Sequence, residues 1–362
     1  MTIAVVIILL LVIAVYAFMH QPSFGKLPSG KRLERIHNSP NYREGSFQNI
    51  HNTPTLEEGQ SYTKVMREFF FNKDKRNIPK TTLPSQKTNL FTLKPDENIL
   101  VWFGHSSYFI QVDGKKILVD PVLSGHASPV SFTTKSYTGT DVYTPDEFPE
   151  IDYLFISHDH WDHLDYKTVT RLKVKKIITG LGTAAHFERW GFDPAMIIEK
   201  DWNEEARLDE GFYVHIFSGR HFSGRGFSRN QSIWVSFVLI TPAMKLFLGG
   251  DSGYDTHFAD IGKAYGPFDL AILECGQYNH YWKYIHMMPE ETAQAAVDLQ
   301  AKVLLPVHWA KFSLGLHSWD EPIIRVTQAA KEKNLPVIHP MIGEMVNLNH
   351  PVAGIRWWEG ID

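Results

Sequence analysis

The sequence contains a single cysteine, Cys275, among 362 residues. One thiol cannot form a disulfide within the chain, and it excludes the zinc and iron–sulfur sites that need several cysteines. An excess of basic residues is also absent, because 36 lysines and arginines stand against 40 aspartates and glutamates. Dedicated nucleic-acid-binding proteins usually carry a basic surface, so we expect no nucleic-acid partner.

Charged residues are missing from positions 3–19, "IAVVIILLLVIAVYAFM". As a helix, this run is just long enough to cross a thin or locally adapted hydrocarbon core. A cleaved secretory signal normally has basic residues ahead of its apolar run, but here they only follow it, from Lys26 to Arg35. The positive-inside rule then predicts a single-pass membrane anchor at residues 1–20 that leaves the rest of the protein on the cytoplasmic side.

The remainder of the chain is predicted to form an extension, one large domain and a short tail. Residues 21–95 are rich in Pro, Asn, Ser, Lys and Arg, so we expect a linker and an N-terminal extension packed on the domain. Between residues 96 and 350, strand-like and helix-like patterns alternate, beginning with two strands around a "DGKK" turn. This alternation predicts an α/β catalytic domain with mixed strand connections, followed by a C-terminal tail at residues 351–362.

Residues 157–165, "SHDHWDHLD", carry three histidines and three aspartates directly after the apolar run "IDYLFI". Alternate residues of an extended chain point the same way, so His158 and His160 can face one point beyond the strand end. Asp162 and His163 follow where the chain turns into a helix, and they can face a second point. Unpaired ionisable groups would each cost desolvation energy, so metal ligands explain this density better than a hydrogen-bonded polar turn.

Three further apolar strands end in a potential ligand: "VHIFSGRH" in His221, "LFLGGD" in Asp251 and "VLLPVH" in His308. The carboxyl ends of strands line the functional crevice of open α/β sheets, so these groups can converge with the first cluster. Imidazoles with carboxylates suit zinc foremost, with manganese and iron as alternatives. The seven candidate ligands are more than the four that one tetrahedral metal ion binds. Two metals about 3.5 to 4 Å apart, sharing one carboxylate, would use all of them and leave room for a bridging hydroxide.

The order of these motifs resembles that of the metallo-β-lactamase-fold hydrolases. Within that superfamily, the chain is most similar to the N-acyl-phosphatidylethanolamine-hydrolysing phospholipase D group, through "SHDHWDHLD", "GGDSGY", "KYIHMMPEETAQAA" and "LLPVHWAKF". The similarity covers most of residues 98–325, and the N-terminal apolar run and linker lie outside it. It implies a four-layer αβ/βα sandwich, in which two packed sheets have helices outside, here preceded by the predicted transmembrane helix.

The resemblance also implies a role for each candidate residue. It assigns six ligands to two zinc ions, the first held by His158, His160 and His221 and the second by Asp162, His163 and His308. Asp251 is implied to bridge the two ions. His286, in "KYIHMMPEE", is implied to lie in the substrate cavity near the metals.

Several other polar residues near the motifs have less specific surroundings. Two roles fit three of these residues. Each can either orient a metal ligand by a hydrogen bond or serve in an ordinary turn or helix cap: His105, Asp120 and Asp165. Asp159 and Trp161 are interpreted as spacers within the motif. Arg225 and Arg229 lie in the polar loop "SGRGFSRN", where arginines are usually solvated, so we predict no site role for them.

The predicted function is hydrolysis of a phosphodiester bond of a membrane phospholipid, as in the phospholipase D group that the sequence resembles. A hydroxide shared by two zinc ions would attack phosphorus while the metals neutralise the developing charge. Asp251 would orient the hydroxide, and His286 would stabilise the transition state or assist the leaving alcohol as a general acid. A lipid substrate agrees with a domain tethered at a bilayer.

Three alternatives remain open at this point. A metal-dependent lactonase or other ester hydrolase would keep the metals and attack a carbonyl instead. A nuclease of the same fold is disfavoured by the acidic charge balance. A membrane-tethered scaffold with structural metals is disfavoured because closed structural sites normally have four protein ligands and no open position.

Overall fold

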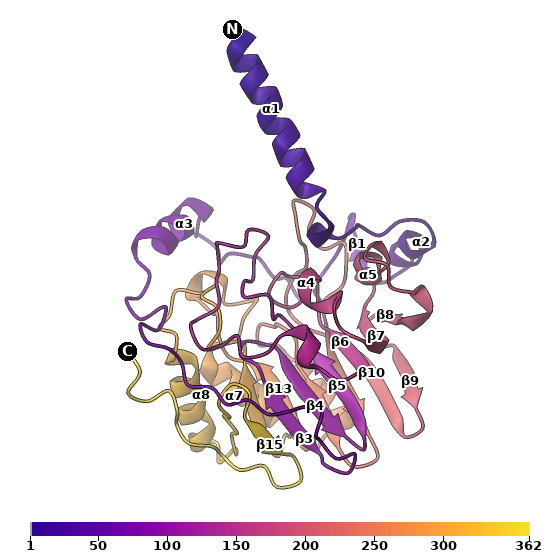
Figure 1. The fold of residues 1–362 in the computed structure, drawn as a ribbon, viewed down its shortest axis with the longest axis vertical. Coiled ribbons are helices and arrows are strands. Elements are labelled where there is room, and N and C mark those ends of the chain that lie inside the picture. The colour runs from indigo at the N-terminus through magenta and orange to yellow at the C-terminus, as the bar shows by residue number, and fades with distance from the viewer. Residues whose placement is uncertain (1) are drawn as a thin grey trace.

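The computed structural model describes residues 2–362, apart from the side chains of Thr2 and Phe70. Two β-sheets form the centre of the molecule (Figure 1). The first has the strand order β15-β3-β4-β5-β6-β7-β8. Its strands are β3 (Ile99–Trp102), β4 (Tyr108–Val112), β5 (Lys115–Val119), β6 (Ile151–Ile156), β7 (Val174–Gly180), β8 (Ile197–Lys200) and β15 (Met345–Asn347). Pairing is antiparallel from β15 to β5 and parallel from β5 to β8.

The second sheet has the order β14-β13-β12-β11-β10-β9. Its strands are β9 (Glu205–Asp209), β10 (Phe212–Ser218), β11 (Val235–Ile240), β12 (Lys245–Leu248), β13 (Leu270–Glu274) and β14 (Leu304–Val307). The strands β9 to β12 pair antiparallel, and β12, β13 and β14 pair parallel. Both sheets therefore contain a parallel part, whose strands end at one common edge.

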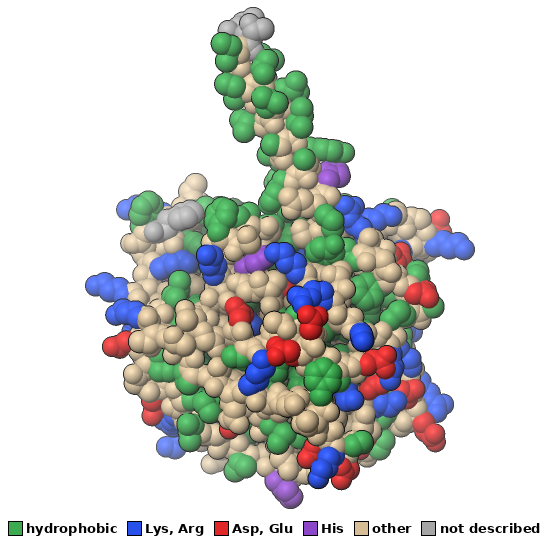
Figure 2. Space-filling model, in the orientation of Figure 1, with side chains coloured by type: hydrophobic (Ala, Val, Ile, Leu, Met, Phe, Trp, Pro, Cys, Tyr) green, Lys and Arg blue, Asp and Glu red, His purple; other side chains and the backbone are tan. Residues whose placement is uncertain are grey.

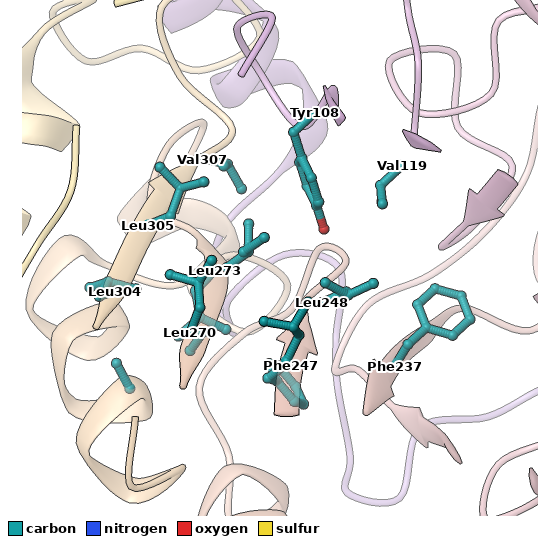
Figure 3. Close-up of a cluster of buried hydrophobic side chains, with 14 of the residues drawn as sticks. Tyr108, Val119, Phe237, Phe247, Leu248, Leu270, Leu273, Leu304, Leu305 and Val307 are labelled. Atoms are coloured by element: carbon teal, nitrogen blue, oxygen red, sulfur yellow. The ribbon is translucent and has the colours of Figure 1, made fainter. Parts of the chain in front are cut away.

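The two sheets pack against each other because alternate side chains of each strand point to opposite faces. Along β3, Leu100 and Trp102 belong to the large core between the sheets, whereas Ile99 and Val101 belong to a second cluster on the outer face. In Figure 3, Tyr108 of β4 points toward Leu248 and the other apolar side chains of the second sheet.

Helices cover the outer face of each sheet. On the first sheet, the outer cluster includes Leu164, Val169 and Phe187, which lie at or in α4 (Tyr166–Val169) and α5 (Ala184–Arg189). On the second sheet, α7 contacts β13 and β14 and also packs on its helical neighbours. The helices of that side are α6 (His257–Tyr265), α7 (Pro289–Asp298) and α8 (Glu321–Glu332).

The chain before the sheets begins with the helix α1 (Thr2–Met19), which stands out from the body of the molecule (Figure 1). It is followed by the short elements η1 (Pro22–Phe24), α2 (Lys31–His37), β1 (Tyr42–Arg43), β2 (Ser46–Phe47) and α3 (Tyr62–Phe71). Three further 3₁₀ turns lie in the domain: η2 (Pro145–Glu147), η3 (Pro194–Met196) and η4 (His280–Trp282). The segment is joined to the domain by side-chain bonds such as Arg32 Nε to Glu199 at 2.8 Å. The boundaries at residues 95 and 350 stay predictions.

The predicted transmembrane anchor is wrong. Across residues 2–362, no helix combines the length and the apolar character that crossing a membrane requires. The apolar side chains of α1 are exposed along the projecting helix (Figure 2). The single-pass topology, the bilayer contact through residues 1–20 and the cytoplasmic placement of the domain fall with this prediction.

Candidate metal centre

The structure brings all seven predicted ligands together at the carboxyl ends of four strands. His158, His160, Asp162 and His163 lie in the loop that joins β6 to α4. The other three side chains follow the strands of the second sheet, His221 after β10, Asp251 after β12 and His308 directly after β14. The ends of these four strands thus lie close together in the structure.

The first group contains His158, His160, His221 and Asp251, whose ligand atoms all lie within 4.8 Å of one another. His160 Nδ1 lies 2.8 Å from His158 Nε2 and 3.2 Å from His221 Nε2. Asp251 Oδ2 closes the group, at 3.6 Å from His221 Nε2 and 3.9 Å from His158 Nε2. Three imidazole nitrogens and one carboxylate oxygen thus face a common point.

The second group contains His105, Asp162, His163 and His308, again with ligand atoms within 4.8 Å of one another. Asp251 reaches this group with its other oxygen, because Oδ1 lies 3.2 Å from His163 Nε2 and 3.1 Å from His308 Nδ1. The two oxygens of one carboxylate therefore face two different groups of histidines.

Unpaired buried atoms show that the donor set fits metal ions. Within residues 2–362, His163 Nε2 and Asp251 Oδ1 are buried without a hydrogen-bond partner. A buried polar atom left unsatisfied costs about 1–3 kcal/mol, which a bound cation would offset. Burial holds the pKa of His158, His221 and His308 well below the usual value. These imidazoles are then neutral, the form that ligates divalent metals such as zinc.

Hydrogen bonds fix the orientation of two of the predicted ligands. His163 Nδ1 donates to the Asp120 carboxylate at 2.8 Å, and His105 Nε2 donates to Asp162 Oδ2 at 2.9 Å. These contacts favour the ligand-orienting role for His105 and Asp120. Asp165 has the capping role, because its carboxylate accepts the Lys167 amide at 3.2 Å at the start of α4.

The chain matches known proteins in both sequence and fold. Residues 115–309 match the Beta-lactamase superfamily domain. An uncharacterised protein of Mycobacterium tuberculosis is 35% identical over 326 residues, which cover 88% of this chain and 87% of that protein. The chain belongs to the metallo-β-lactamase-fold hydrolases. The predicted mixed α/β metallo-β-lactamase-like fold is thereby confirmed, and the fold implies divalent metal ions.

Two further proteins are similar to this metallo-β-lactamase-fold hydrolase, one in sequence and one in fold. The N-acyl-phosphatidylethanolamine-hydrolyzing phospholipase D 1 of Caenorhabditis elegans is 29% identical over 271 residues, covering 66% of this chain and 75% of that protein. A solved metallo hydrolase from the archaeon Ignicoccus hospitalis superposes with a TM-score of 0.52 at 21% identity, covering 69% of this chain and 97% of the archaeal one. The predicted relation to the phospholipase D group is confirmed.

A cavity of about 390 Å³ opens above the two groups. Its polar floor includes His160, His221 and Asp251. Its apolar walls are formed by Leu56, Val65, Phe222, Trp282, Ile285 and Leu314. Leu56 and Val65 lie in residues 21–95, so the segment predicted as a linker and N-terminal extension supplies part of the wall. Trp161, interpreted from sequence as a spacer, also lines this cavity.

His286 lies on the floor of the same cavity, as the sequence resemblance implies. Its ring centroid is 5.0 Å from that of His221 and 5.2 Å from that of His308. Its Nδ1 donates to Glu274 Oε2 at 2.9 Å. Burial lowers the pKa of His286, but the Glu274 carboxylate outweighs this effect and raises it to about 9.

Sequence analysis missed Glu274, which is 1% exposed and stands at the end of β13. Its other oxygen, Oε1, accepts the amides of Met287 at 3.0 Å and Ser252 at 3.2 Å. The carboxylate is therefore fixed between the loop of Asp251 and the loop of His286. The segment "DLAILE" ends an apolar strand in an acid, which is the same pattern that indicated His221, Asp251 and His308.

Two further residues of the loops were misinterpreted from sequence. Arg225 was expected to be solvated, but it is 5% exposed and donates to the carbonyl groups of Asp159 and Leu164. Asp159 was interpreted as a spacer, but its carboxylate accepts from Gly224 N at 2.7 Å and Ser232 Oγ at 3.0 Å. Both side chains hold the loop that carries four of the predicted ligands.

Proposed function

We propose that the protein is a dinuclear zinc hydrolase that cleaves a phosphodiester bond of a phospholipid. The observation that carries the proposal is the position of Asp251, whose two oxygens face two separate groups of histidines on the floor of an apolar cavity. A carboxylate shared between two cation sites is typical of hydrolytic two-metal centres.

The proposed ligands divide between two ions as the sequence resemblance implies. One ion would be held by His158, His160 and His221, the other by Asp162, His163 and His308, with Asp251 shared. Bound zinc ions supply Lewis acidity that neutralises phosphoryl charge and makes water a nucleophile near neutral pH. In the chain itself, Asp120 and His105 fix the orientation of His163 and Asp162 by hydrogen bonds.

His286 is the proposed general acid. Glu274 accepts the hydrogen bond from His286 Nδ1, which fixes the tautomer and the orientation of the ring. The ring lies on the cavity floor with Asp251, where it can give a proton to the oxygen of a departing alcohol. Since the chain offers this proton donor, the leaving group need not depart as an alkoxide.

Two observations support a lipid substrate. The Caenorhabditis elegans relative is named for hydrolysing N-acyl-phosphatidylethanolamine. The cavity walls are apolar, with Phe222, Trp282 and Ile285 above the polar floor, and such a wall accommodates acyl chains next to a phosphodiester.

A hydrolysis panel on the zinc-replete protein tests the proposal. The substrates are N-acyl-phosphatidylethanolamine, phosphatidylcholine, bis(p-nitrophenyl) phosphate and an acyl lactone. We expect phosphatidic acid to be released from the N-acyl lipid and nitrophenol from the soluble diester. The His160→Ala protein is the matched control and should lose both activities. Turnover of the lactone alone would contradict the phosphodiesterase assignment and identify an ester hydrolase of the same fold.

A further inference from the structure

Arg225, in the loop between β10 and β11, holds the backbone of the ligand loop at two points. Its Nη1 donates to the carbonyl oxygen of Asp159 at 2.8 Å and to that of Leu164 at 2.7 Å. The residues between these two carbonyls include His160, Asp162 and His163, three of the proposed ligands. One nitrogen of one guanidinium therefore fixes both ends of the segment that supplies them.

The same guanidinium also binds the N-terminal segment. Its Nε and Nη2 donate to the carbonyl oxygen of Ser23 at 3.0 and 2.8 Å. Ser23 belongs to η1, and the adjacent Phe24 packs edge-on against Trp161 of the ligand loop, with ring centroids 5.0 Å apart. Arg225 thus joins the 3₁₀ turn η1, which follows α1, to the loop that carries the proposed ligands.

The surroundings of Arg225 explain why a cation is tolerated there. Its guanidinium stacks over the Trp161 ring at 3.9 Å from the centroid, and the buried Asp159 carboxylate offsets its charge. Asp159 is bound in turn to Gly224 N, one residue before Arg225. The planar guanidinium of arginine can donate to several carbonyl groups at once. A lysine ammonium on its flexible side chain cannot reproduce this geometry.

We propose that Arg225 is a positioning residue of the metal centre, which sets the spacing of the ligand loop and couples it to the segment Pro22–Phe24. The inference rests on the proposed metal assignment and extends it to a residue outside both ligand groups. Outer contacts that orient metal ligands typically contribute 10–100-fold to metal affinity, and we expect an effect within about that range.

Titration of the metal-free full-length protein with Co²⁺ tests this inference, because the visible spectrum of bound Co²⁺ reports ligand geometry without any turnover. The variants are Arg225→Gln and Arg225→Lys. The matched control is Arg189→Gln, because Arg189 binds the N-terminal segment through the His20 carbonyl at 2.8 Å and is exposed. We expect Arg225→Gln to weaken Co²⁺ binding about 10–100-fold and to change the visible bands. Arg189→Gln should leave both unchanged.

Circular dichroism and urea unfolding of the metal-free proteins separate positioning from folding. Arg225→Lys keeps the charge and loses the planar guanidinium, so it should fold and still bind Co²⁺ more weakly than the wild type. Wild-type affinity and spectrum in both Arg225 variants would overturn the inference and leave the proposed function intact. Failure of the wild-type protein to bind Co²⁺ would instead overturn the proposed metal centre and the inference with it.

Discussion

Asp251 Oδ1 lies 3.2 Å from His163 Nε2, and across the described part of the chain neither atom has a hydrogen-bond partner. A cation bound to both atoms would offset the cost of burying them. The other oxygen of Asp251 faces His221 at 3.6 Å, so one side chain serves both groups.

Replacement of Asp251 by Asn should therefore affect both halves of the centre. We expect the Asp251→Asn protein to bind less than two equivalents of zinc and to lose more than about 100-fold in activity. Residues that only orient ligands contribute up to about 100-fold, so a shared ligand should contribute more. Metal analysis after dialysis checks this expectation. Asp260→Asn, on the exposed side of α6, is the control. Full metal content in the Asp251 variant would remove its bridging role.

His105 should contribute to metal affinity without being one of the predicted ligands. Its Nε2 donates to Asp162 Oδ2 at 2.9 Å, and its loss leaves that carboxylate free to rotate. We expect His105→Ala to weaken the binding of one metal ion about 10–100-fold, measured by competition with a chromophoric chelator. His350→Ala, near the C-terminus and exposed, should bind zinc as the wild type does. Complete loss of one metal ion would point to a ligand role for His105 instead.

Glu274 and His286 should act as one unit. Glu274→Gln replaces the charged acceptor of the His286 Nδ1 hydrogen bond by a neutral amide, and His286→Ala removes the proposed acid itself. General acids typically contribute 10²–10⁴-fold, so we expect a loss of kcat within about that range for His286→Ala, a smaller loss for Glu274→Gln, and little change in KM.

A double-mutant cycle shows whether the two residues are coupled. Since Glu274 acts through His286, the double variant should be no slower than His286→Ala alone. Losses that multiply in the double variant would mean that Glu274 acts independently of His286. Metal content should stay unchanged in all three proteins.

Gly250 allows the chain before Asp251 to pass close to the first sheet. A Cβ at this position would lie 2.7 Å from Ser157 Cβ and 2.8 Å from the Val235 carbonyl oxygen. We expect Gly250→Ala to lower the free energy of unfolding by about 1–3 kcal/mol, as overpacking does, and to reduce zinc affinity because Asp251 shifts. Urea unfolding measures the first effect. Gly354→Ala, which meets nothing closer than 3.5 Å, is the control and should cost less.

The convergence of the ligands could be predicted because its signal is local. In "SHDHWDHLD" the spacing of His158 and His160 follows from the geometry of an extended chain, and the strand-end positions of His221 and His308 follow from strand topology. The alternation of strands and helices likewise predicts the mixed α/β fold. None of these inferences needs a contact between distant segments.

The residues that sequence analysis missed depend on contacts made only in the folded chain. Arg225 is buried because Ser23 and Leu164, which are far from it in sequence, present carbonyl groups to it. The Asp159 carboxylate likewise accepts hydrogen bonds from His186 and Ser232, which are also distant from it in sequence. Glu274 is different, because "DLAILE" already shows it at the end of a strand. The apolar residues before it indicated a buried strand more strongly than they indicated a functional site, so Glu274 was missed. The anchor prediction failed because no helix within residues 2–362 is both long and apolar enough to cross a membrane.

The central claim is that one centre of two metal ions carries the hydrolysis. Titration of the metal-free protein with zinc, followed by the rate of bis(p-nitrophenyl) phosphate hydrolysis, tests it most directly. The account predicts no turnover without metal and a rate that reaches its plateau at two equivalents of zinc per chain. Turnover by the metal-free protein, or a plateau at one equivalent, would contradict it.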